Sequence, residues 1–200
     1  MERRISTQPA CRNAQKTGRR ISGYGAVYYN GTPGTEYQLA RDLVERIMPG
    51  AFDRAAKDDD VRGLFNHDPN FVLGRTTSGT MFLSTDKTGL WYDISVGLTN
   101  SGADVIEHVA RGDVSGSSFS FLIPPGGEHW RRENGIDIRE ITAVELFDVG
   151  PVTFPAYEAT TAEARQESIR ARDAWHKDGK GQQQYAARER QIRLMEMQAT

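Results

Sequence analysis

The chain has 200 residues, of which 38% are hydrophobic and 26% charged, with a formal net charge of -2 and a mean hydropathy of -0.59. The near-neutral charge argues against a dedicated nucleic-acid-binding protein, and no stretch is apolar enough for a secretory signal or a membrane-spanning helix. Cys11 is the only cysteine, which excludes an internal disulfide and favours a reducing compartment. We therefore expect a soluble, intracellular protein whose core needs no disulfide or metal.

Composition divides the chain into three parts. Residues 1–20 are basic and polar and predict a flexible basic arm, most simply a solvated tail, although such an arm could contact nucleic acid or an acidic partner. Residues 21–158 alternate apolar runs with turn residues and predict the folded domain. Residues 159–200 are charged and Gln-rich without a convincing apolar stripe, which predicts a tail or an extended linker.

Strands dominate the predicted elements of the domain. Taken in chain order, strands are expected at 21–30, around 61–65, within 71–98 (two or three), at 116–121 and within 136–154 (one or two).

Three short helices are expected between these strands. The first lies within 37–48, because apolar residues recur there at helical spacing before Pro49 and Gly50. The others are expected at 51–60 and 101–112, the last with Gly112 near its C-cap. The predicted fold class is therefore α+β and strand-dominated, an antiparallel β-barrel or sandwich with short helices packed around it.

The stretch GDVSGSSFSF (112–121) places four serines in and before a predicted strand. Because side chains alternate along a strand, Ser118 and Ser120 would share one face with Gly116, whereas Ser117 would lie on the other face with the phenylalanines. Gly116 leaves space beside Ser118 for an approaching carbonyl. A serine becomes a nucleophile only with a base within hydrogen-bond distance; without one, the stretch is a strand of small residues.

Of the four histidines, His67 is the best candidate for that base. It ends a short apolar run and precedes a turn, and residues held by a scaffold at such ends commonly carry function. The histidines at 108, 129 and 176 are expected on an exposed helix, in a loop and in the tail. Asp68 is expected to serve the Asp-Pro turn. No His or Cys spacing fits a metal site and no phosphate-binding loop is present, so no metal or cofactor is predicted.

An acidic group should orient the base. The segment EITAVELFDVGPVTFPAY offers Glu140, Glu145 and Asp148. Asp148 would share a strand face with Leu146, and an acid on an apolar face is costly unless it is paired. Asp148 therefore ranks first and Glu145 second; the alternative for either is an edge-strand carboxylate that meets water.

Six segments in this order resemble the prohead (procapsid maturation) serine proteases of tailed bacteriophages: MPGAF, FNHDPNFVLGRT, SGT, DKTGLWYDISV, RGDVSGSSFSF and LFDVGPVTFPAY. The resemblance covers about residues 23–160. Members of this family are similar in fold to the herpesvirus assemblins, which implies a β-barrel ringed by helices.

The resemblance implies a serine endopeptidase with three catalytic residues. Ser118 in GSSFSF would be the nucleophile and His67 in FNHD the general base. The third member would fall in LFDVGPVTFPAY, where Asp148 fits best and where assemblins use a second histidine. A base with an ordinary imidazole pKa near 6.5 predicts loss of activity below about pH 6.

The sequence departs from the family pattern at two positions: Ser120 stands where Gly is common, and Gly150 stands where Ser is common. Ser120 would add a second hydroxyl to the nucleophile's face. Backbone N–H groups would stabilise the oxyanion, with Arg131 and Arg132 as candidate helpers.

The resemblance also implies the biological setting. The protease would cleave scaffolding protein, the scaffold-like segment of the major capsid protein and itself, inside the assembling prohead in the host cytoplasm. It permits a homodimer and implies no membrane or specific nucleic-acid partner. Two alternatives stay open: a non-catalytic capsid-assembly or scaffolding protein that keeps the fold, and a hydrolase of small esters. The latter lacks support because the sequence has no GxSxG motif.

Overall fold

The computed structural model describes residues 2–5, 11–15, 19–154 and 162–177. The strands in chain order are β1 (Glu2–Ile5), β2 (Cys11–Gln15), β3 (Arg20–Val27), β4 (Tyr37–Ala40), β5 (Leu43–Ile47), β6 (Arg62–Leu64), β7 (Val72–Arg75), β8 (Met81–Thr85), β9 (Gly89–Ser95), β10 (Gly116–Leu122), β11 (Glu128–Glu133), β12 (Ile136–Ile141) and β13 (Glu145–Val152). The helices are α1 (Ala55–Asp58), α2 (Asn100–Arg111) and α3 (Ala162–Lys177), with a 3-10 turn, η1, at Pro33–Thr35.

These strands form three open sheets, with the orders β1-β10-β13-β6-β7, β2-β3-β9-β8 and β11-β12-β5-β4. The predicted strand-rich class with few helices is confirmed, but the predicted antiparallel barrel is wrong, because the described strands form no closed barrel. A barrel requires the outer strands of a sheet to pair with each other. In the first sheet the outer strands β1 and β7 do not, and two pairs, β5 with β12 and β6 with β13, are parallel.

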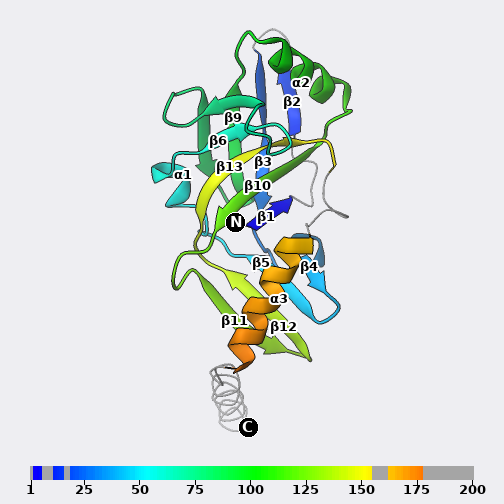
Figure 1. The fold of residues 1–200 in the computed structure, drawn as a ribbon, viewed down its shortest axis with the longest axis vertical. Coiled ribbons are helices and arrows are strands. Elements are labelled where there is room, and N and C mark those ends of the chain that lie inside the picture. Colours follow the sequence, from blue (N-terminus) through cyan, green and yellow to red (C-terminus); the bar gives the residue numbers. More distant parts are fainter. Residues whose placement is uncertain (1, 6–10, 16–18, 155–161, 178–200) are drawn as a thin grey trace.

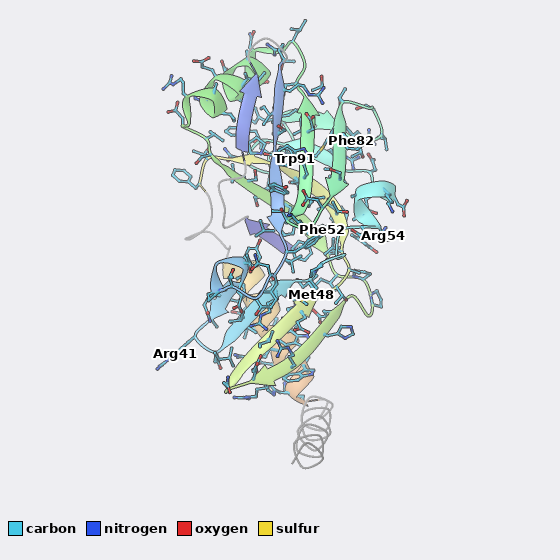
Figure 2. All side chains as sticks on the ribbon, turned by 180° about the vertical axis from the view of Figure 1, so that it is seen from behind. Arg41, Met48, Phe52, Arg54, Phe82 and Trp91 are labelled. Atoms are coloured by element: carbon cyan, nitrogen blue, oxygen red, sulfur yellow. The ribbon has the colours of Figure 1, made fainter. Side chains whose placement is uncertain are left out.

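The first two sheets pack against each other and enclose the main core. Figure 1 shows them together in the upper part of the molecule, with the third sheet and α3 below. Their approach is close: a Cβ placed on Gly25 of β3 would lie 2.3 Å from Cγ2 of Val149 on β13. Phe119 of β10 stacks on Phe121 and meets the ring of Phe52 edge-on. Figure 2 shows Phe52 between the upper and lower parts of the molecule.

The helix predicted within 37–48 is wrong, because this segment is the antiparallel hairpin β4–β5. Leu39 and Leu43 are both buried at a spacing of four, which a helix would also give. In the hairpin, the turn between β4 and β5 restarts the alternation of buried and exposed side chains, so Leu39 and Leu43 can both be buried. Figure 2 shows Arg41 projecting from this turn. The buried Glu45 favours a strand over a helix for this segment. Its carboxylate pairs with Arg139 of the adjacent strand β12 at 3.1 Å, and this contact depends on the pairing of β5 with β12.

The other two predicted helices are confirmed. The one expected at 101–112 is α2, where Thr99 Oγ1 accepts a hydrogen bond from the N–H of Gly102 at 3.0 Å. Gly112 ends it in the left-handed conformation with φ of 85°, which glycine adopts without strain. The helix expected at 51–60 is α1, shortened to a single turn.

The two end segments, predicted as a flexible arm and a tail, contain strands and a helix. Within the segment 1–20, β1 pairs with β10 and β2 pairs with β3, so these two pieces belong to the sheets rather than to an arm. Within 159–200, α3 is a helix whose Trp175 stacks on Trp130 of β11, with the ring centroids 5.9 Å apart. The rest of both predicted segments lies outside the described residues, and the three-part division stays a prediction.

No helix in the described ranges combines the length and apolar character needed to cross a bilayer.

Candidate active site

The two faces of β10 separate the serines of the stretch GDVSGSSFSF (112–121). Ser117 lies on the core side, where its hydroxyl is 2.8 Å from the hydroxyl of Tyr92. Ser118 and Ser120 lie on the opposite face, as strand alternation predicted, and are 1% and 0% exposed. Ser115 precedes the strand and is exposed. The four serines therefore have different surroundings, and two of them share one buried surface.

The neighbouring strand β13 brings an acid to that surface through an irregular pairing. Ser120 is opposite Asp148, but Phe121 is opposite Leu146, so Phe147 is an extra residue on β13. An extra residue reverses the alternation. Asp148 therefore faces Ser120 while Leu146 faces the core, and the expectation that Asp148 and Leu146 share one face is wrong.

A strained turn after β6 supplies the histidine. Asn66 and His67 both adopt positive φ, 55° and 57°, which is uncommon for residues other than glycine and is often found at functional sites. Asn66 holds the turn against the end of β13: its N–H donates to the carbonyl of Pro151 at 3.0 Å. Its side chain exchanges hydrogen bonds with Thr153 at 2.8 and 3.0 Å.

The imidazole of His67 connects the two strands. Its Nε2 is 2.6 Å from Ser118 Oγ, and its Nδ1 is 2.5 Å from Asp148 Oδ1. The side chains of His67 and Asp148 are 10% and 7% exposed. Ser120 Oγ lies 3.1 Å from the same Nδ1. One imidazole thus contacts three buried side chains.

The partners of His67 define the position of its proton. An ionised Asp148 can only accept a hydrogen bond, so Nδ1 carries the hydrogen of the neutral ring. Nε2 is then the unprotonated nitrogen, and it faces the Ser118 hydroxyl. A serine, a histidine and a carboxylate connected in this order can transfer the serine proton to the ring while the carboxylate stabilises the resulting cation.

A comparison with known families agrees with this geometry. Residues 7–174 match the family model described as caudovirus prohead serine protease. The chain belongs to this family. No curated protein and no solved structure matches the chain significantly. The family confirms the resemblance seen in the sequence, and all three residues of the cluster lie inside the matched range.

The other acids considered as the orienting group lie elsewhere in the fold. Glu145 is exposed at the start of β13, opposite Leu122. Glu140 accepts a hydrogen bond from Arg131 Nε at 2.7 Å in the third sheet. Asp68 serves its turn, as predicted, and accepts a hydrogen bond from the N–H of Asn70 at 2.8 Å.

The two arginines considered as oxyanion helpers have other partners in the third sheet. Arg131 binds Glu133 as well as Glu140, and Arg132 is 3.6 Å from Asp137. These pairs hold both guanidinium groups within the β11–β12 hairpin, so neither is placed at Ser118.

The remaining histidines lie outside the cluster. His108 and His129 are exposed, on α2 and β11 respectively. His176 of α3 is 2.8 Å from Asp137. In the described ranges no group of three or more His, Cys, Asp or Glu side chains is arranged to hold a metal ion.

Asn66 was missed by the sequence analysis. Its signal is the dipeptide Asn-His after a short strand, since Asn tolerates positive φ better than most residues. The contact between Ser120 and His67 was also missed, although Ser120 had been noted on the nucleophile's face.

Proposed function

We propose that the chain is a serine endopeptidase of phage capsid maturation, with Ser118 as nucleophile, His67 as general base and Asp148 as the orienting acid. The observation that carries the proposal is the continuous chain of short contacts from Ser118 Oγ through the imidazole to Asp148 Oδ1, at 2.6 and 2.5 Å. Membership of the prohead serine protease family supports it independently.

The mechanism is acyl transfer through a covalent intermediate. His67 Nε2 takes the hydroxyl proton as Ser118 Oγ attacks a peptide carbonyl, and the imidazolium then gives that proton to the leaving amine. A water molecule then attacks the acyl carbon while His67 Nε2 takes its proton, and the imidazolium gives that proton to Ser118 Oγ as the acyl–Oγ bond breaks and the carboxylic acid leaves. Asp148 holds the ring through Nδ1 and stabilises its positive charge.

The proposed substrates are those of the setting that the family implies. They are the scaffolding protein, the scaffold-like segment of the major capsid protein and the chain itself, cleaved inside the assembling prohead. The proposal permits a homodimer but does not require it, because the three residues come from one chain.

The deciding experiment is co-expression with the major capsid protein of the same genome, followed by intact-mass analysis. Wild type is expected to shorten the capsid protein or itself, and Ser118→Ala is expected to leave both intact. Identical products from both would reject Ser118 as the nucleophile, and no product from either would favour a non-catalytic assembly protein.

Ser117→Ala is the matched control. It removes a buried hydroxyl from the adjacent position of β10, but that hydroxyl faces Tyr92 rather than His67. Cleavage by Ser117→Ala together with no cleavage by Ser118→Ala separates loss of the nucleophile from loss of a stabilising hydrogen bond.

A further inference from the structure

Ser120 stands out because its side chain reaches the catalytic histidine from the same strand as the nucleophile. Its Oγ is 3.1 Å from His67 Nδ1, while Ser118 Oγ is 2.6 Å from Nε2. The two nitrogens of one ring thus contact side chains two residues apart on β10. Ser120 is fully buried and lies opposite Asp148 in the strand pairing, so the backbone fixes its position.

The direction of this contact follows from the tautomer. Since Nδ1 carries a hydrogen that points to Asp148, the oxygen of Ser120 acts as a second acceptor for the same N–H. The dipole of a buried hydroxyl interacts strongly with a cation that forms beside it, because little solvent screens the interaction. The same contact limits rotation of the ring away from Ser118.

We propose that Ser120 is a positioning residue that shares the Nδ1 hydrogen of His67 with Asp148, holds the ring toward Ser118 and stabilises the imidazolium during acyl transfer. The inference rests on the proposed function and adds a fourth member to its hydrogen-bonded chain.

Steady-state kinetics of Ser120→Ala test the role. Loss of one hydrogen bond to a charged ring is expected to lower kcat about 5- to 10-fold, with KM changed less than about 2-fold, because the contact strengthens only as the ring becomes charged. Ser120→Thr, which keeps the hydroxyl, is expected to restore most of kcat. Ser117→Ala is the matched control, and its kcat is expected to equal that of wild type.

An unchanged kcat in Ser120→Ala, or an equal loss in Ser117→Ala, would overturn the inference. A measurement without turnover keeps it separate from the proposed function. In the Ser118→Ala background, Ser120→Ala is expected to shift the His67 Nδ1–H proton resonance, assigned by its disappearance in His67→Gln. If this resonance does not move, Ser120 does not share the hydrogen, whatever the enzyme cleaves.

A second observation concerns the edge of β10. Strand β1 pairs antiparallel with β10 so that Ile5 lies opposite Ser118 and Arg3 opposite Ser120. Ser118 is only 1% exposed in this arrangement, so a polypeptide cannot reach its hydroxyl. The family match begins at residue 7, which places β1 outside the matched part. Without β1, β10 would be an outer strand of the first sheet.

We also infer that β1 occupies the place of the substrate and must leave before catalysis. An outer strand binds an extended peptide through main-chain hydrogen bonds. The ligand of this edge would therefore be an extended segment of polypeptide that pairs with β10 as β1 does. This inference rests on the proposed function and describes its regulation, because the chain's own N-terminal strand competes with substrate.

Two variants of the full chain isolate the strand pairing. Arg3→Pro/Arg4→Pro removes two adjacent N–H groups, one of which points at β10, whereas Arg3→Ala/Arg4→Ala removes the same side chains and keeps the N–H groups. A serine-directed fluorophosphonate is expected to label Ser118 about 5-fold faster or more in the proline variant than in wild type or the alanine variant. Equal rates would overturn the inference.

Binding of a labelled peptide tests the same edge without chemistry. A fluorescent peptide of residues 1–6 is expected to bind the proline variant and to raise its anisotropy, and to bind wild type at least about 10-fold more weakly because β1 already fills the edge. Equal binding to both proteins would show that β1 does not compete. This result stands even if no protein is labelled at Ser118.

Discussion

At the scale of single residues, the site depends on how His67 is held. Its backbone is in the left-handed region, with φ of 57°, and the preceding Asn66 ties the turn to β13. Strain of this kind persists only where surrounding contacts enforce it. The enforced turn brings the ring between Ser118 and Asp148 from a separate element of the fold.

Replacing Asp148 with asparagine is expected to reduce kcat/KM roughly 1,000-fold or more, with little change in KM. An amide cannot stabilise the imidazolium, and it no longer fixes the hydrogen on Nδ1. Peptidase kinetics of Asp148→Asn and wild type measure the effect. A loss below about 10-fold would mean that another group orients the ring.

Asp68→Asn provides the control for the adjacent acid. The Asp68 carboxylate accepts a hydrogen bond from the N–H of Asn70 at 2.8 Å, and the amide oxygen of asparagine can accept the same bond. Activity within about 3-fold of wild type is expected. A large loss here would mean that removal of any negative charge near the turn impairs the enzyme.

Among the secondary-structure elements, Gly150 explains how β13, β6 and β10 fit together. Gly150 lies opposite Ser118, so β13 places no side chain across from the nucleophile. A Cβ at this position would be 2.2 Å from the carbonyl oxygen of Leu64 on β6. In this chain the close approach of the two backbones therefore leaves no room for a side chain at position 150.

Gly150→Ala is expected to destabilise the protein by about 2–3 kcal/mol and to lower activity, because β6 must move and the His67 turn follows it directly. Urea unfolding and peptidase assays measure both effects. Gly97→Ala is the control, since no atom lies within 4 Å of the added Cβ, and a change below about 0.5 kcal/mol is expected there. Equal effects of the two substitutions would contradict the clash.

The same elements show what the sequence could and could not predict. Strand alternation placed Ser118 and Ser120 on one face, and a C-cap glycine marked the end of α2, because these signals are local. The prediction of a helix within 37–48 was wrong because burial of two residues four positions apart, here Leu39 and Leu43, fits both a helix and a hairpin with a two-residue turn. The predicted face of Asp148 was wrong because Phe147 is an extra residue only in relation to the partner strand β10, which the sequence does not show. Parallel pairing of β6 with β13 is likewise invisible without the fold.

In the molecule as a whole, the buried hydroxyl of Tyr28 affects stability at high pH. Tyr28 follows β3, is 4% exposed and packs its ring against Phe52 with centroids 6.0 Å apart. Within the described residues its hydroxyl makes no hydrogen bond of good geometry, although the backbone N–H groups of Phe52 and Gly50 lie close enough to oppose part of the rise in its pKa. Burial, followed by the negative charge of Asp53, raises the pKa of Tyr28 to about 12.

This raised pKa predicts alkaline destabilisation. The unfolded chain releases the Tyr28 proton near pH 10 and the folded chain near pH 12, so the folded state binds more protons between these values. The contribution is fully present below pH 10 and is lost as pH rises toward 12. The free energy of unfolding is expected to fall by about 1–2 kcal/mol over that interval, allowing for screening of the Asp53 charge by solvent.

Tyr28→Phe is expected to remove this part of the slope and, at pH 7, to leave stability unchanged or slightly higher, because it deletes an unpaired buried hydroxyl and keeps the ring. Urea unfolding of both proteins from pH 8 to pH 12 makes the comparison, and the other tyrosines and lysines contribute equally to each. The two curves should run parallel up to pH 10 and then diverge, with the phenylalanine variant the more stable. Curves that stay parallel to pH 12 would mean that Tyr28 ionises as freely in the folded protein as in the unfolded chain, and that the junction around Phe52 admits water.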